Sequence, residues 1–233
     1  MARFYDAIMD DPAPRAERVL GLLERHRPGP GSVLELACGT GAILERLDRV
    51  PDRTGLDLSE EMLAQARTRL PGVELVRADM RDFDLGRRFD AVLCVFDSIN
   101  HLLDFAEWES TFAAVHRHLV PGGLFVFDVN TLGELWRIGE EQPFVHDFDG
   151  NLLVMDVQVG TGGRVSWDLR VFERTGPTTF ELHHETIGEL GVELARIVGA
   201  LSGPFEVLEV TDPEGRPADD DSVRAYFACR RPT

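Results

Sequence analysis

Apolar and polar residues follow two different periods along this chain, and the change comes near residue 144. In the first two thirds, short apolar runs alternate with stretches that place apolar side chains at helical spacing. The runs that predict strands are 32–37, 53–57, 73–77, 89–95 and 124–129, and the helical stretches are 15–25, 42–47, 60–70 and 105–119. Strands that alternate with helices of this length predict a parallel sheet with helices on both faces.

From residue 144 to residue 186 the apolar period becomes two, as in a half-buried strand. Trp167 and Leu169 alternate with Asp168 and Arg170, and glycine-containing turns interrupt the segment. This pattern predicts an antiparallel meander of three or four strands at 141–188, inserted after the fifth strand.

The α/β pattern resumes after the insertion, with a helical stretch at 190–201 and strands at 204–210 and 223–230. We therefore expect a single α/β domain over 1–233, built on a doubly wound, seven-stranded, mostly parallel sheet with helices on both faces. In such sheets, ligands bind beyond the carboxyl ends of the strands. The residues just past those ends, which should converge, are Cys38, Asp57, Asp79, Phe96 and Asn130.

The composition of the chain excludes some classes of binding partner and some kinds of chemistry. The formal net charge is −17, and all 24 basic residues are arginines. The acidic balance argues against nucleic acid or an anionic membrane as partner, and the lack of lysine excludes Schiff-base chemistry. No apolar run is long enough to span a membrane and no signal peptide is visible, so we expect a cytoplasmic protein. The three cysteines match no zinc spacing and are expected to be buried and reduced.

A glycine turn closes the first predicted strand. Residues 35–41 read Glu-Leu-Ala-Cys-Gly-Thr-Gly, and Asp57 lies at the end of the second predicted strand. The glycines let the backbone approach a ligand closely, and the acid accepts hydrogen bonds from ribose hydroxyls, which is the layout of a nucleoside-binding crevice. A dinucleotide site would carry a third small residue where this chain has Leu44. Glu35 would repel a phosphate and suits a cationic ligand.

Five segments, in this order, resemble the class I S-adenosylmethionine-dependent methyltransferases. They are motif I at 35–41, the ribose-binding acid in 55–59, the adenine segment at 78–80, the fourth strand at 89–96 and the turn at 119–124. Residues 4–6, Phe-Tyr-Asp, are similar to the N-terminal Tyr-Asp of small-molecule members. The late antiparallel insertion resembles that of glycine N-methyltransferase-like and amino-sugar N-methyltransferase groups.

This resemblance implies a Rossmann-like fold with S-adenosyl-L-methionine as cofactor. The implied reaction is methyl transfer to a nitrogen or oxygen of a small-molecule acceptor. The insertion is expected to roof the substrate pocket, and the protein is expected to be a monomer or homodimer.

The resemblance also assigns roles to individual residues. The cofactor-binding residues that it implies are Tyr5, Glu35, Ala37, Gly39, Gly41, Asp57, Leu58, Met62, Asp79, Met80, Val95 and Phe96. His101 follows the fourth strand, where it is either a general base or a residue that packs at the start of the next helix. Candidate substrate contacts are Asp97, Asn130, Trp167 and His184. The alternatives for these four are an N-cap, a loop-bridging amide, a core aromatic residue and a half-buried histidine.

Metal binding is not expected. His183 and His184 are adjacent in a predicted strand, so their side chains point to opposite faces and cannot chelate one ion together. Two other functions stay open. A NAD(P)-dependent oxidoreductase is opposed by the missing third glycine and by Glu35, and a non-catalytic S-adenosylmethionine-binding module is opposed by the intact glycines and Asp57.

Overall fold

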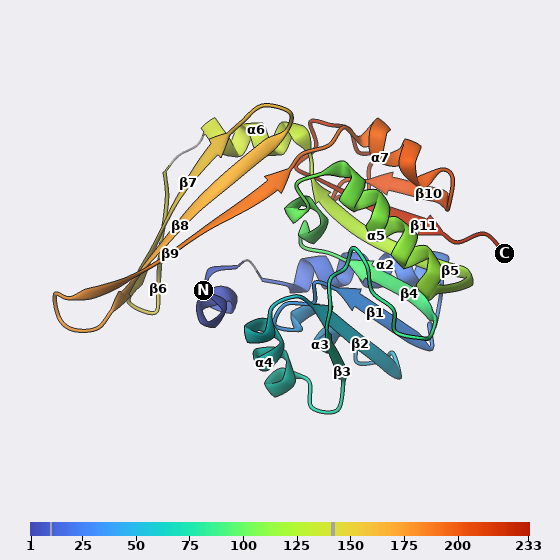
Figure 1. The fold of residues 1–233 in the computed structure, drawn as a ribbon, viewed down its shortest axis with the longest axis horizontal. Helices are drawn as coiled ribbons and strands as arrows, with labels where there is room; N and C mark the ends of the chain where they lie inside the picture. The colour runs from blue at the N-terminus through green and yellow to red at the C-terminus, as the bar shows by residue number, and fades with distance from the viewer. Residues whose placement is uncertain (10, 141–142) are drawn as a thin grey trace.

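Two β-sheets build the protein, and the computed structural model describes residues 1–9, 11–140 and 143–233. The larger sheet has seven strands in the order β10-β11-β5-β4-β1-β2-β3 (Figure 1). The strands are β1 (Ser32–Leu36), β2 (Asp52–Asp57), β3 (Glu74–Arg77), β4 (Phe89–Cys94), β5 (Leu119–Asn130), β10 (Glu206–Thr211) and β11 (Arg224–Arg230). β11 is antiparallel to both of its neighbours, and the other pairs are parallel. The strand order reverses between β1 and β4, which is where α/β sheets bind ligands.

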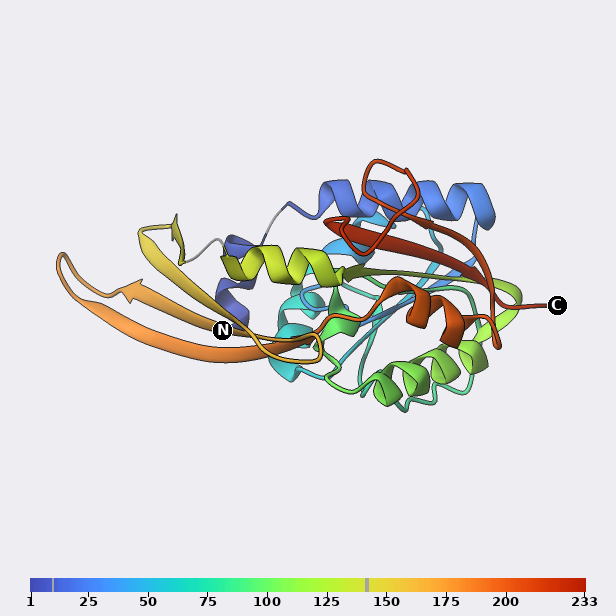
Figure 2. The same ribbon diagram turned by 90° about the horizontal axis from the view of Figure 1, so that it is seen from above.

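Helices cover both faces of this sheet. They are α2 (Ala13–His26), α3 (Ala42–Arg46) and α4 (Glu60–Arg69) on one face, and α5 (Phe105–His118) and α7 (Leu194–Leu201) on the other. Figure 2 shows α2 and α5 on opposite sides of the strands. Each helix buries an apolar stripe, such as Val19 and Leu22 of α2 and Trp108 and Phe112 of α5. Burial of these stripes fixes the sheet between two helical layers.

The second sheet is antiparallel and extends away from the first (Figure 1). Its strands follow chain order, β6 (Phe144–Phe148), β7 (Asn151–Val159), β8 (Arg164–Arg174) and β9 (Phe180–Leu190). α6 (Leu132–Glu140) packs on one end of it through Leu135, which shares an apolar cluster with Val157 and Val165. Nearer the other end, Phe4 of the N-terminal segment shares a cluster with Phe148 and Val171. That segment consists of η1 (Ala2–Phe4) and α1 (Tyr5–Ile8).

The predicted fold class is confirmed, because the structure contains the seven-stranded, mostly parallel sheet, helices on both faces and an antiparallel insertion after β5. Of the insertion predicted at 141–188, residues 141–142 lie outside the described residues, and β9 continues to Leu190. The prediction that a helix begins at residue 190 was therefore wrong, since α7 begins at Leu194.

β5 is longer than its apolar run predicts. It begins at Leu119 and includes the Pro-Gly-Gly turn that was expected to precede it. The turn can join the strand because Gly122 adopts a φ of 75° and its N–H donates to the carbonyl of Arg231 at 3.0 Å. The helices at 2–8, 98–101 and 132–140 were not predicted. None of the helices in the described part of the chain has the length and apolar character that crossing a membrane requires.

Candidate functional site

The turn after β1 brings the glycine motif against the end of β2. Ala37, Gly39 and Gly41 all have positive φ, of 49°, 55° and 80°. The Gly39 N–H donates to Asp57 Oδ2 at 2.8 Å, and the Ser59 N–H donates to Asp57 Oδ1 at 2.8 Å. A carboxylate offers about four lone-pair sites, so Asp57 keeps acceptor capacity on both oxygens. Asp57 thus holds the turn and can still accept hydrogen bonds from a ligand.

Gly41 shapes the turn without lining a cavity. A Cβ at this position would lie 2.5 Å from Leu70 Cδ1, and its positive φ disfavours any other residue. Met62 also lies outside the cavity linings, in the first turn of α4, where its N–H donates to the Ser59 hydroxyl at 3.3 Å. Both residues were predicted to contact a cofactor. In the structure, Gly41 shapes the turn and Met62 helps to form the start of α4, and neither lines the two cavities.

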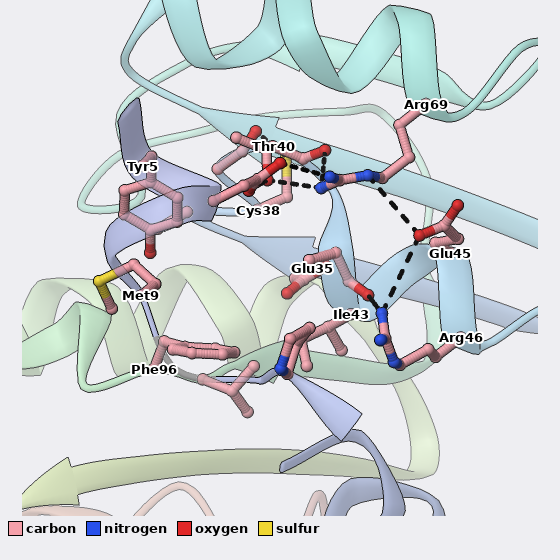
Figure 3. Close-up of a pocket in the computed structure, with 16 residues that line it drawn as sticks. Tyr5, Met9, Glu35, Cys38, Thr40, Ile43, Glu45, Arg46, Arg69 and Phe96 are labelled. Atoms are coloured by element: carbon pink, nitrogen blue, oxygen red, sulfur yellow. Dashed lines mark hydrogen bonds and ion pairs between the residues drawn. The ribbon is translucent and has the colours of Figure 1, made fainter. Parts of the chain in front are cut away.

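Glu35 is a buried acid in the wall of a cavity of about 250 Å³ (Figure 3). Glu35 is 3% exposed, and its Oε2 has no hydrogen-bond partner among the described residues. Burial holds the pKa of Glu35 well above its ordinary value, although a backbone hydrogen bond with Leu44 opposes this shift. Tyr5, Val95 and Phe96 line the same cavity. A buried carboxylate oxygen without a partner is an unfilled position for a cationic ligand.

The N-terminal segment forms one wall of this cavity. Tyr5 lines it, and burial raises the pKa of the Tyr5 phenol above its ordinary value. Asp6 accepts a hydrogen bond from the Thr40 hydroxyl at 2.7 Å and forms an ion pair with Arg69 of α4. The segment is therefore attached to the glycine turn on one side and, through Phe4, to the second sheet on the other.

A second cavity of about 500 Å³ lies on the other side of Ala37, which lines both cavities. Its further lining includes four predicted cofactor contacts, Asp57, Leu58, Asp79 and Met80, and also His101 and Arg81. The Arg81 side chain donates hydrogen bonds to both Asp79 oxygens and lowers the pKa of that carboxyl. The two cavities share Ala37, and the predicted cofactor contacts that line them follow the carboxyl ends of β1, β2, β3 and β4.

Buried charges gather beyond the end of β4. Phe96 and Asp97 have positive φ values of 60° and 49°, a conformation that costs energy in residues other than glycine. Arg224 of β11 lies 2.7 Å from Asp97 and also pairs with Asp128 of β5. Burial raises the pKa of Asp128, while Arg224 opposes that shift. Asp97 is thus part of a buried ion-pair network rather than a helix cap.

Glu189 of β9 completes this region, and the sequence did not indicate it. The Asn130 side chain donates to Glu189 Oε2 at 3.0 Å and accepts from Arg224 Nη2 at 2.9 Å, so this amide bridges the two residues. Burial raises the pKa of Glu189 to about 7, reinforced by Asp97 and opposed by His101, Asn130 and Arg224. The only sequence signal is an acid beside an apolar stretch, where a helix was expected.

His101, at the end of η2 (Ser98–His101), has a defined tautomer when neutral. Its Nδ1 lies 3.1 Å from the carbonyl oxygen of Gly188. A carbonyl only accepts hydrogen bonds, so Nδ1 carries the proton and Nε2 is the acceptor. His101 is exposed to the second cavity, where Nε2 is available to a ligand.

Trp167 and His184 are not brought into either cavity. Residue pairing in β8 and β9 places Trp167 opposite Ile187 and Arg170 opposite His184, so the tryptophan and the histidine lie on opposite faces of the sheet. His184 forms an ion pair with Asp168 at 2.8 Å and is half exposed. Trp167 packs into the apolar clusters under α6 and the N-terminal segment. The position of His184 argues against its predicted contact with a substrate.

Comparison with known proteins agrees with this geometry. Residues 33–123 match the family described as "Methyltransferase domain". The chain is 41% identical to dTDP-3-amino-3,4,6-trideoxy-alpha-D-glucopyranose N,N-dimethyltransferase of Streptomyces venezuelae over 54% of this chain. That alignment covers 53% of the relative, so the chain spans about half the length of the curated relative.

Solved structures match over nearly the whole chain. Streptomyces venezuelae DesVI is 30% identical, with 99% of this chain and 95% of that chain covered and a TM-score of 0.81. The chain belongs to the S-adenosylmethionine-dependent methyltransferases. An amino pentose methyltransferase of this family from Micromonospora echinaspora, CalS10, was solved with S-adenosylmethionine bound. It is 28% identical, with 97% of this chain and 94% of that chain covered and a TM-score of 0.75.

The residues present fit S-adenosylmethionine, the cofactor of the methyltransferases. The molecule carries positive charge, and Glu35 offers an unpartnered buried carboxylate oxygen in the first cavity. It also carries ribose hydroxyls, and Asp57 has acceptor capacity left at the edge of the second cavity. A dinucleotide fits less well, because its diphosphate would lie beside Glu35.

Proposed function

We propose that the chain transfers a methyl group from S-adenosylmethionine to a nitrogen of a small-molecule amine, of the amino-sugar class. The observation that carries the proposal is the pair of acids at the glycine turn, the buried Glu35 and the loop-bound Asp57. The choice of nitrogen is supported by relatives named as sugar N,N-dimethyltransferases. When bound, the cofactor supplies an electrophilic methyl group, so the protein needs no strong nucleophile of its own.

Individual residues of the chain would bind different parts of the cofactor and the acceptor. Asp57 would bind the ribose and Glu35 the cationic end, while Tyr5 and Phe96 would close the first cavity over them. Leu58, Asp79 and Met80 line the part of the second cavity expected to hold the adenine. Positioning of this kind can lower a barrier by roughly 7–11 kcal/mol. His101 would accept a hydrogen bond from the acceptor nitrogen at Nε2, because Nδ1 already donates to Gly188.

The four-stranded sheet and the N-terminal segment would cover the acceptor side of the site. Glu189, at the end of β9, reaches the buried charges beyond β4, which supports this placement. The three cysteines are buried and free, as expected for a reducing compartment, and we keep the cytoplasm as the proposed location. A monomer or homodimer remains the expected assembly, which sedimentation equilibrium would measure.

Substitution of Asp57 tests the proposed cofactor site. Asp57→Ala should weaken binding of S-adenosylhomocysteine by roughly ten- to a hundredfold, since hydrogen bonds to a charged acceptor contribute about 1.5–3 kcal/mol. Calorimetric titration measures the affinity, and transfer of a labelled methyl group to a panel of amines measures the reaction. Asp52→Ala, on the exposed end of the same strand, is the matched control. Unchanged affinity in Asp57→Ala, or no transfer to any amine by the unaltered protein, would contradict the proposal.

A further inference from the structure

Three side chains from separate segments meet beyond the carboxyl ends of β4 and β5. They are Asp97, which follows β4, His101 of η2 and Glu189 of β9. One polar atom from each lies within 4.8 Å of the other two. A hydrogen bond from nitrogen to oxygen spans about 2.9 Å. A single small cation between the three side chains can therefore contact all of them.

The charges around this cluster do not cancel. Three carboxylates, those of Asp97, Asp128 and Glu189, lie near the guanidinium of Arg224, which makes direct ion pairs with the first two, and Arg15 also lowers the pKa of Asp128. Glu189 is 4% exposed, and the hydrogen bond described for its side chain comes from the neutral amide of Asn130. A buried carboxylate whose described hydrogen bond comes from a neutral amide favours a cationic ligand over a neutral one.

A monovalent ligand fits the cluster better than a divalent metal ion. Arg224 lies 2.7 Å from Asp97 and would repel a metal ion bound to the same carboxylate. An ammonium group carries half that charge and brings N–H donors that suit carboxylate oxygens and a histidine nitrogen. The Glu189 carboxylate is also poised near neutral pH, because burial and Asp97 raise its pKa to about 7 against His101, Asn130 and Arg224.

We propose that Glu189, together with Asp97 and His101, binds the methyl acceptor as an ammonium ion and takes up the proton that its nitrogen must lose. This inference rests on the proposed function and narrows its substrate to amines that are protonated in solution. A neutral hydroxyl acceptor would leave Glu189 without a counter-charge.

The proposed step balances as follows. An N–H bond of the ammonium ion breaks, its proton goes to a Glu189 oxygen, and the electron pair stays on nitrogen. That pair then forms the new nitrogen–carbon bond with the methyl group, while the carbon–sulfur bond breaks and its electrons stay on sulfur. The methylated nitrogen again carries a positive charge, and the proton on Glu189 returns to solvent as the product leaves.

Binding to the protein saturated with S-adenosylhomocysteine tests this role without turnover. The probes are dTDP-3-amino-3,6-dideoxy-α-D-glucopyranose and the matching sugar with a 3-hydroxyl group. Glu189→Gln keeps an oxygen that accepts from Asn130, and Glu185→Gln, an exposed acid on the same strand, is the control. We expect the amine to bind about tenfold more weakly to Glu189→Gln, in line with the loss of one charge-assisted hydrogen bond. The hydroxyl sugar and Glu185→Gln should show no change.

The pH dependence gives a second readout. Glu189 is ionised above a pKa of about 7, so the amine affinity of the unaltered protein should fall as the pH drops from 8 to 6. Glu189→Gln should show a clearly weaker dependence. The groups facing Glu189 that could add to the slope are Asp97, His101 and Arg224, and they are unchanged in the variant.

Each contrary outcome has a definite meaning. Equal affinity for the amine and the hydroxyl sugar, no binding of the amine, or an unchanged affinity in Glu189→Gln would overturn the role of Glu189. Tight binding of Mn²⁺ that requires Glu189 would assign the cluster to a metal and also overturn it. Titration with S-adenosylhomocysteine alone separates the two proposals, since a protein that does not bind it fails as a methyltransferase whatever Glu189 does.

Discussion

Two buried glutamates lower the stability of the fold and also occupy positions in the proposed binding site. Glu35 and Glu189 are 3% and 4% exposed, and burial raises the pKa of both side chains. Glu189 accepts a hydrogen bond from Asn130, whereas Glu35 Oε2 has no partner among the described residues. A buried charge without a partner destabilises a fold. Such a residue in a cavity wall is a strong indicator of a binding role.

Substitution of Glu35 should therefore separate stability from function. Glu35→Gln should raise the free energy of unfolding at pH 8 by about 1 kcal/mol and weaken binding of S-adenosylhomocysteine. The sign follows from burial, which holds the folded pKa of Glu35 well above 4.5, so the unaltered protein loses stability as the pH rises through the interval above 4.5. Urea denaturation from pH 5 to pH 8 should show the gain growing with pH. Glu24→Gln, on the exposed side of α2, is the control, and a destabilised Glu35→Gln would refute the argument.

The N-terminal segment is the element that joins the two sheets over the first cavity. Phe4 is buried beside Phe148 and His183 of the second sheet, with ring centroids 5.9 Å and 5.4 Å away. Asp6 bonds to Thr40 beside the glycine turn. Tyr5 lies between these two attachments and lines the cavity. The segment is short, so its position depends on these contacts rather than on helix propensity.

Loss of the Phe4 attachment should affect binding more than global stability. We expect Phe4→Ala to lower the affinity for S-adenosylhomocysteine by about tenfold, or about 1.4 kcal/mol, because Tyr5 no longer covers the cavity. Hydrogen exchange should become faster at residues 2–8, with a small change in the thermal midpoint. Val145→Ala, an exposed truncation on β6, serves as the control. A large fall in the midpoint with unaltered affinity would instead make Phe4 a residue of the general core.

At the scale of the whole molecule, Arg224 connects distant parts of the chain. It lies near the C-terminus, on β11, and its guanidinium pairs with Asp97 after β4 and Asp128 on β5. Through Asn130 it also positions Glu189 at the end of the second sheet. The strand order puts β11 beside β5, which is why a late residue can neutralise acids from the middle of the chain.

Removal of this cation should destabilise the entire fold. Arg224→Met should cost about 3–5 kcal/mol, because it removes the ion-pair partner of Asp97 and of the fully buried Asp128. The deficit should be smaller at pH 5 than at pH 8, since burial raises the folded pKa of Asp128, which takes up a proton as the pH falls. Arg230 lies on β11 like Arg224, and Arg230→Met, which removes its exposed ion pair with Glu206 of β10, should cost less than about 1 kcal/mol. Urea denaturation measures both, and equal losses would contradict this assignment.

The order of strands and helices was readable from the sequence because it depends on local periods and turn residues. The seven-stranded sheet, the antiparallel insertion and the Ser59 cap of α4 all follow from patterns within a few residues. The glycine turn and Asp57 were also readable, because a tight approach to a ligand needs particular residue types at one place. The β9 boundary and the short helices were missed, since packing against other elements stabilises them.

The buried charge network was decided only by the tertiary structure. Arg224, Asn130 and Glu189 lie far apart in the chain, and nothing local to Glu189 distinguishes it from the exposed Glu185 on the same strand. Similarly, the pairing of β8 with β9 turned His184 outward. Local sequence determines which elements form, because hydrogen bonding and turn geometry act over a few residues. Burial and charge pairing arise from contacts between those elements. The exposure and the charge partners of each acid are therefore set only when the chain folds.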